Sequence, residues 1–112
     1  MNILGIDFEE WFHPQIIQKY VENKKREPSI INGIDKILDL LRTHETHATF
    51  FVVGELLEHR PELLDKILSN GHEIGFHTMY HTRLDAPGFK ESFVNEIEDF
   101  AKLTNGHSRG FR

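Results

Sequence analysis

The chain has 112 residues, of which 38% are hydrophobic and 28% charged, and these proportions are ordinary for a single soluble globular domain. It contains no cysteine, so disulfides, thiolate nucleophiles and sulfur-ligated metal sites are excluded. Any metal would have to be held by histidine nitrogen and carboxylate oxygen. A formal net charge of -5 argues against a surface built for phosphate backbones, and we expect no nucleic-acid partner.

The amino-terminal residues predict neither a secretion signal nor a membrane anchor. Residues 3–6 are apolar, but no basic segment precedes them and no long apolar core follows. No stretch approaches the roughly 20 apolar residues that are needed to span a bilayer. As the sequence is written, we expect a cytoplasmic protein without a membrane partner. A signal segment further upstream would change that expectation.

Two apolar runs in the first half of the chain predict strands, at residues 3–6 and 48–53. Their residues are β-branched or aromatic and do not alternate with polar ones, which is typical of strands buried on both faces. Between the two runs, apolar residues recur at helical spacing, and Ser29 stands where a capping residue is expected. The residues at this spacing are Ile30, Ile31, Ile34, Ile37, Leu38 and Leu41.

The second half of the chain continues the alternation. Pro61 at a first-turn position, an apolar stripe within residues 63–68 and the stop signal at residues 70–71 predict a helix. Residues 72–76 predict a short strand. A last helix is marked by Phe89, Phe93, Ile97, Phe100 and Leu103, and a fourth strand begins near Ser108. Strands alternating with helices predict an α/β fold with parallel strands, in an open sheet or a barrel.

Polar side chains follow every predicted strand. Asp7 comes after the first strand, Glu55 after the second and His77 after the third. Arg112 follows the first residues of the fourth strand. The carboxyl ends of parallel strands lie on one face of an α/β fold, and ligands bind there. We therefore expect these four side chains to share one rim.

His77 and His81 are four positions apart, so one helical turn, or a tight loop of similar pitch, would aim both imidazoles at a single point. Two neutral imidazoles need at least one carboxylate to complete a set of three protein ligands, with water in an open position. The anions available on the same rim are Asp7, Glu9 and Glu10.

The zincin pattern of two histidines at this spacing requires a glutamate after the first histidine, as general base. Thr78 stands in that place, so the base must come from elsewhere, and Asp7 is the candidate. The alternatives are that His77 and His81 are ordinary histidines of a polar loop, and that Asp7 caps a turn or helix.

Four segments, in this order, resemble the successive motifs of the polysaccharide deacetylase family, the NodB-homology group of carbohydrate esterases. They are residues 5–13 (GIDFEEWFH), 48–54 (ATFFVVG), 71–81 (GHEIGFHTMYH) and 110–112 (GFR). The resemblance implies a distorted (β/α) barrel and a divalent metal, commonly zinc. It also implies an N-acetylated carbohydrate substrate, from which an amino sugar loses its acetyl group by hydrolysis.

The resemblance also implies roles for individual residues. Asp7 matches the catalytic base, and Arg112 matches the arginine that orients this base. The expected metal ligands are His77 and His81 together with Glu9, or with Glu10 as the alternative acid.

Two departures from the family pattern affect these expectations. Thr82 stands where family members usually have proline, and the chain stops inside the third motif, before the motif that supplies the general acid. We therefore interpret residues 1–112 as the N-terminal portion of one deacetylase domain, a partial (β/α) barrel. An unpaired sheet edge should make it marginally stable or prone to self-association. A genuine small three-stranded α/β domain is the alternative.

Two other functions stay open at this stage. The chain could be a non-catalytic metal-binding or sugar-binding module, that is, a pseudoenzyme. Within the enzyme class, it could belong to a deacetylase-like amidase of purine catabolism.

Overall fold

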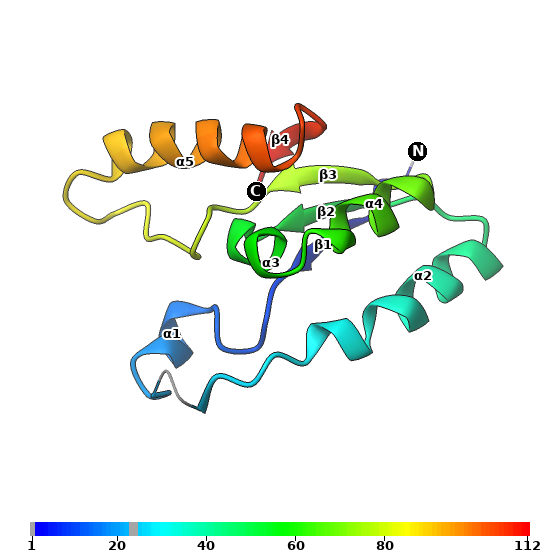
Figure 1. Cartoon of the computed structure of the whole chain (residues 1–112), viewed down its shortest axis with the longest axis horizontal. Helices are drawn as coiled ribbons and strands as arrows, with labels where there is room; N and C mark the ends of the chain where they lie inside the picture. The colour runs from blue at the N-terminus through cyan, green and yellow to red at the C-terminus, as the bar shows by residue number, and fades with distance from the viewer. Residues whose placement is uncertain (1, 23–24) are drawn as a thin grey trace.

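The computed structural model describes residues 2–22 and 25–112, and they form one parallel four-stranded sheet with helices packed on one face (Figure 1). The strands lie side by side in chain order, β1-β2-β3-β4. This order follows when each helical crossover places the next strand beside the last, as in a (β/α) barrel. The predicted parallel α/β alternation is confirmed. The strands are β1 (Gly5–Phe8), β2 (Thr49–Val52), β3 (Glu73–Phe76) and β4 (Ser108–Phe111).

The helical segments are α1 (Gln15–Gln18), η2 (Ile30–Asn32), α2 (Ile34–Thr43), α3 (Gly54–His59), α4 (Glu62–Ser69) and α5 (Phe89–Leu103). The sequence did not predict α3, because a helix of six residues is too short to show an apolar period of 3.6. Within the described ranges, no helix is both long enough and apolar enough to cross a membrane.

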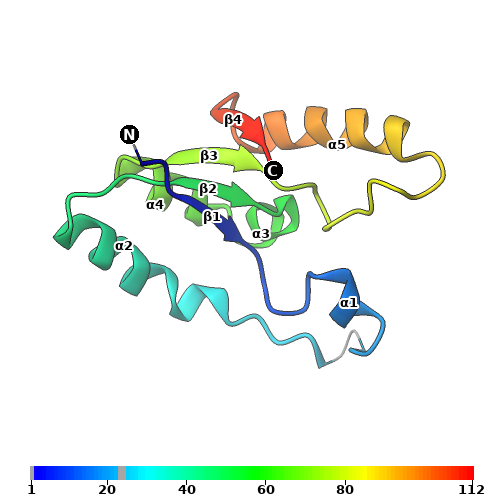
Figure 2. The same cartoon turned by 180° about the vertical axis from the view of Figure 1, so that it is seen from behind.

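The hydrophobic core lies between the helices and one face of the sheet. Figure 1 shows α3 and α4 in front of the strands, and Figure 2 shows the same helices behind them. The apolar stripes predicted for α2 and α4 are buried here. Each fully buried side chain of this size stabilises the fold by about 1.5–3 kcal/mol. Core side chains with no exposed surface include Ile34, Phe50, Val52, Leu63, Ile67 and Ile74.

The opposite face of the sheet is more open, and in Figure 2 no helix of the described residues covers it. In β2 the buried Phe50 is followed by the partly exposed Phe51, so burial on both faces is a wrong prediction for this chain. The first strand also begins two residues later than predicted. Ile3 is 84% exposed, because the pairing with β2 starts at Gly5.

Three of the strands end level, and this alignment positions the functional side chains. The register pairs Phe8 with Val52 and Val52 with Phe76. The ladder continues beyond the strands, since the His77 N–H donates to the Val52 carbonyl and the Arg112 N–H to the Phe76 carbonyl, each at 3.1 Å. His77 and Arg112, which follow β3 and β4, therefore lie along one edge of the sheet, as predicted. Asp7 was predicted to follow the first strand and instead lies within β1, paired with Phe51.

Ser29 stands at the N-cap position of the 3-10 turn η2, as predicted, but its side chain makes no capping hydrogen bond. Instead, the Glu10 carboxylate accepts hydrogen bonds from the backbone N–H groups of Ser29 and Ile30, at 2.9 and 3.1 Å. An anion that accepts free N–H groups at a helix start is favourable there. The cap comes from a residue 19 positions earlier, beyond the reach of local patterns.

Candidate metal centre

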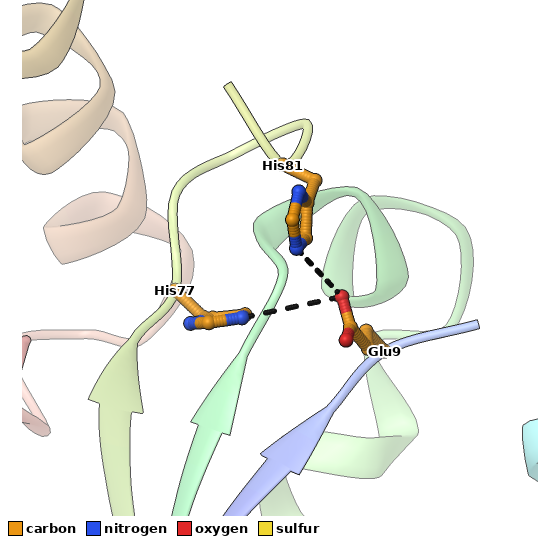
Figure 3. A group of neighbouring side chains, drawn as sticks. All are labelled: Glu9, His77 and His81. Atoms are coloured by element: carbon orange, nitrogen blue, oxygen red, sulfur yellow. Dashed lines mark ion pairs between the residues drawn. The ribbon is translucent and has the colours of Figure 1, made fainter. Parts of the chain in front are cut away.

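Three side chains from two distant segments converge at the edge of the sheet (Figure 3). Glu9 follows β1, while His77 and His81 lie in the loop after β3. One oxygen of Glu9 and one nitrogen of each histidine lie within 4.8 Å of one another. Glu9 Oε2 is 3.1 Å from His81 Nε2 and 4.0 Å from His77 Nε2. Within residues 2–22 and 25–112, no other group of three potential ligands is this close.

The chemistry of these three side chains suits a divalent cation. Glu9 Oε2 is buried and has no hydrogen-bond partner among the described residues. An ionised oxygen left in this state costs free energy, and a cation between it and the two imidazoles would remove that cost. Two histidine nitrogens and one carboxylate form a three-ligand set that leaves coordination positions open for water and substrate.

The orientation of His77 supports its use as a ligand. Its Nδ1 atom forms a hydrogen bond with the main-chain carbonyl oxygen of Arg112. Because a carbonyl oxygen can only accept, Nδ1 must carry the proton, and Nε2 presents its lone pair toward Glu9. Histidines that bind metals are commonly oriented by a second hydrogen bond of this kind. The fourth strand thus contributes to the centre through its backbone.

The segment that carries both histidines is a tight loop and not a helical turn. Thr78 and His81 have left-handed backbone conformations, with φ of 58° and 55°. Such a conformation is uncommon outside glycine, and least favourable for a β-branched residue. The Thr82 N–H closes the loop by donating to Thr78 Oγ1 at 2.9 Å. A proline at position 82 could not make this bond.

The first turn of α3 supports the same loop. The N–H groups of Gly54 and Glu55 donate to the carbonyl oxygens of Thr78 and Met79, at 3.0 and 2.8 Å. The Met79 side chain is 1% exposed and packs directly on Gly54. A Cβ atom on Gly54 would lie 2.2 Å from Met79 Sδ, so only glycine fits at this position.

Asp7 and Arg112, the two predicted catalytic residues, form an ion pair beside this centre. Arg112 Nε lies 3.3 Å from Asp7 Oδ1, and both side chains are partly exposed. The guanidinium group also lies over the Phe51 ring, 5.8 Å from its centroid. The ion pair with the Arg112 guanidinium orients the carboxylate of Asp7, which lies two residues before the candidate ligand Glu9.

The structure separates the two candidate acids of the first motif. Glu10 is 2% exposed, and both of its carboxylate oxygens accept hydrogen bonds from Ser29 or Ile30. Glu10 is therefore not part of the three-residue group, whose acid is Glu9. Adjacent residues at the end of a strand point in opposite directions, and this alternation gives the two glutamates different neighbours.

Glu55 follows β2, as predicted, but it lies outside the three-residue group and pairs with His13 instead. Its Oε2 lies 2.9 Å from His13 Nε2, and His13 Nδ1 accepts the Glu10 N–H at 2.9 Å. His13, the last residue of the first motif, is only 3% exposed. The pair lines a separate cavity of about 360 Å³.

The polysaccharide deacetylase family model matches residues 31–112. The chain belongs to the polysaccharide deacetylase family. It is 48% identical over 68 residues to a peptidoglycan-N-acetylglucosamine deacetylase of Bacillus cereus, a match that covers 61% of this chain and 32% of that protein. It is 41% identical over 56 residues to a chitooligosaccharide deacetylase of Sinorhizobium fredii. This match covers 50% of this chain and 26% of that protein.

Solved structures of the family agree with the fold. The peptidoglycan deacetylase PdaC from Bacillus subtilis superimposes with a TM-score of 0.68 at 26% identity, over 98% of this chain and 46% of that one. The predicted deacetylase type of (β/α) fold is confirmed. The chain spans about a third or less of the two curated relatives, and less than half of the PdaC structure.

One residue beside the candidate metal centre has no signal in the sequence. Gln15, in α1, donates from Nε2 to the His81 carbonyl at 2.9 Å. Gln15 belongs to an irregular stretch after β1, where no sequence motif and no apolar periodicity points to it as a functional residue. With both histidines it lines an open cavity of about 480 Å³. The other lining residues are Thr78, Thr82, Arg83, Leu84, Asp85, Phe111 and Arg112.

Proposed function

We propose that this chain carries the metal centre and the catalytic base of a hydrolase that removes N-acetyl groups from an amino-sugar polymer or oligosaccharide. The observation that carries the proposal is the buried, unpartnered oxygen of Glu9, which faces His77 and His81 beside the pair of Asp7 and Arg112. The two curated relatives act, by their names, on peptidoglycan and on chitooligosaccharides, both built from N-acetylated sugars.

In this proposal the metal is zinc, held by Glu9, His77 and His81. When bound, it would supply Lewis-acid polarisation of the acetyl carbonyl and would lower the pKa of the attacking water. Zinc accepts nitrogen and oxygen ligands together, and the lack of cysteine is compatible with such a centre.

The residues of this chain bind, orient and move the proton. Arg112 holds Asp7 Oδ1, so Oδ2 is the oxygen that takes a proton from the attacking water. The Arg112 carbonyl keeps the His77 ring in the tautomer that a ligand requires. The cavity of about 480 Å³ beside the histidines receives the acetamido group and its sugar ring. No described residue is assigned as the general acid.

The proposal includes a domain arrangement. Residues 1–112 would form the N-terminal portion of one NodB-like domain, and the alignment to 46% of the PdaC structure supports this. Among the described strands, β1 and β4 are the edges of the sheet, and we expect self-association through them. Sedimentation velocity over a range of concentrations tests this expectation, which fails if the chain stays monomeric throughout.

A zinc titration by calorimetry tests the metal centre. One ion should bind per chain, and binding should be lost in both His77→Ala and His81→Ala. His107→Ala is the matched control, because His107 is exposed and outside the three-residue group, and it should bind as the unchanged chain does. If neither histidine change weakens binding, the ligand assignment is wrong.

Acetate release from N-acetylglucosamine oligomers by the whole protein tests the reaction. Asp7→Asn should abolish release while zinc binding persists, because Asp7 is assigned to proton transfer. Metal binding without acetate release in the unchanged protein would favour a non-catalytic binding module. Turnover of a purine-derived amide, without acetate release from sugars, would favour the amidase alternative.

A further inference from the structure

The loop that carries both histidines is held from outside by one side chain of α5. Glu96 Oε2 accepts the Met79 N–H at 2.8 Å, and Glu96 Oε1 accepts the Thr82 hydroxyl at 2.7 Å. Both oxygens are engaged, and both partners belong to the same short loop. Hydrogen bonds to an ionised carboxylate are stronger than those between neutral groups. Glu96 is partly buried, so water competes with these bonds less than at a fully exposed site.

The positions of these two bonds bracket His81. Met79 precedes it by two residues, and Thr82 follows it directly. The backbone bonds from α3 reach Thr78 and Met79, and the Glu58 side chain of α3 accepts a longer bond from the Tyr80 hydroxyl at 3.4 Å. None of these bonds from α3 reaches His81 or Thr82, so that part of the loop depends on other contacts. Glu96 provides one such contact through Thr82, and Gln15 provides another by donating to the His81 carbonyl.

The loop needs such restraint because its conformation is unfavourable by itself. Each left-handed residue other than glycine costs about 1–2 kcal/mol, and the loop has two, Thr78 and His81. Without external contacts the chain would relax toward ordinary backbone angles. A relaxation at His81 would move its Nε2 away from Glu9, which lies 3.1 Å from it.

We propose that Glu96 is a positioning residue of the metal centre, which fixes His81 by bridging Met79 and Thr82 across the loop. The inference rests on the proposed function, because it assigns Glu96 a role in presenting a metal ligand. Glu96 itself touches neither the metal nor the substrate. Its substitution should therefore change metal affinity and coordination geometry through His81.

Three substitutions separate hydrogen bonding from charge. Glu96→Ala removes both bonds. Glu96→Gln keeps an acceptor for the Met79 N–H and places an amide opposite the Thr82 hydroxyl, which can turn to accept. Thr82→Val removes only the hydroxyl and preserves the Thr82 N–H bond to Thr78. Glu98→Ala is the matched control, because Glu98 is an exposed acid on the same helix and its loss gives the same change in charge.

The experiment measures zinc affinity of the 112-residue chain by competition with a chromophoric chelator, and the visible spectrum of its Co²⁺ form. Glu96→Ala should weaken affinity by about 10- to 100-fold, the range for residues that orient metal ligands, and should alter the Co²⁺ bands. Thr82→Val should weaken affinity by a smaller factor. Glu96→Gln should restore most of the affinity, and Glu98→Ala should match the unchanged chain.

The outcomes are distinguishable. If the unchanged chain binds zinc and Glu96→Ala binds it equally well, Glu96 has no positioning role although the metal centre stands. If Glu96→Gln is as damaging as Glu96→Ala, charge is responsible and the hydrogen-bond bridge is overturned. If the unchanged chain binds no zinc, the proposed centre fails, and this inference with it. Melting curves of the metal-free variants identify general destabilisation, which would leave the Co²⁺ spectrum of the folded fraction unchanged.

Discussion

The third strand has a pair of neighbouring histidine rings at each of its ends, and the two pairs have opposite environments. At its carboxyl end, the rings of His77 and His81 lie 5.3 Å apart and face the carboxylate of Glu9. At its amino end, the rings of His47 and His72 lie 5.9 Å apart, and no third ligand group is near them in the described chain.

The hydrogen bonds of the two pairs explain the difference. His72 is 6% exposed, and its Nδ1 accepts the Ala48 N–H at 3.2 Å, so its lone pair already has a partner. Burial, and to a lesser extent the neighbouring His47, lower the pKa of His72, which keeps it neutral. His77 donates from Nδ1 instead, which leaves Nε2 free to bind. In this chain, the pair that suits a metal is the one in which a histidine donates from Nδ1 and a carboxylate lies near the other ring nitrogens.

The largest expected effect separates the two adjacent glutamates. Glu9→Gln should weaken zinc binding by more than about 100-fold, beyond the range for residues that only orient ligands, because it removes the anion between the imidazoles. The metal-free chain should be no less stable, since the buried Oε2 of Glu9 has no hydrogen-bond partner among the described residues. Glu10→Gln is the control and should leave zinc affinity unchanged. Calorimetry and thermal melts measure both, and a reversed pattern would make Glu10 the ligand.

The next effect concerns the glycine beneath the histidine loop. Gly54→Ala should destabilise the chain by about 1–3 kcal/mol, because the new methyl group overlaps Met79. Zinc affinity should fall too, since the loop would have to shift. Gly33→Ala is the control: its nearest neighbour would be an oxygen at 3.7 Å, so it should have little effect. Urea unfolding measures both variants, and equal stability would show that the loop adapts without cost.

At the opposite end of the strand, His72→Ala should affect stability and not metal binding. It leaves the buried N–H of Ala48 without its acceptor, which costs about 1–3 kcal/mol. Zinc affinity, measured on the folded protein, should be unchanged. A loss of zinc binding in this variant would mean that the two ends of the strand are coupled.

The smallest expected effect is a pH dependence at the same residue. Because the pKa of His72 is lowered in the folded chain, the unfolded chain binds more protons as the pH falls through the ordinary value of about 6.5. Its contribution to stability is therefore present above that value and is lost below it. His72→Asn keeps an acceptor for Ala48 but cannot titrate, so part of the pH dependence should disappear. Unfolding of the metal-free chain at pH 5 and pH 8 checks this, and identical pH slopes would refute it.

Local patterns predicted most of the fold. The apolar period of α2 and α4 and the stop signal at residues 70–71 placed these helices, and the β-branched run at 48–53 placed β2. The short helix α3 and the cap of the turn before α2 were not predicted. The 3-10 turn η2 before α2 is capped by Glu10 and not by the Ser29 side chain, and α3 has too few residues to show a period. Both depend on contacts between segments far apart in the chain.

The sequence by itself determined the parallel α/β order, the family resemblance and the candidate residues at the strand ends, because these depend on local spacing and on motifs. Only the tertiary structure decided which of these residues meet. It brought Glu9 to the histidine pair and Glu10 to the start of the 3-10 turn η2, because the two side chains leave the chain in different directions just after β1. It also brought Glu96 to the histidine loop, through contacts that exist only once α5 has packed.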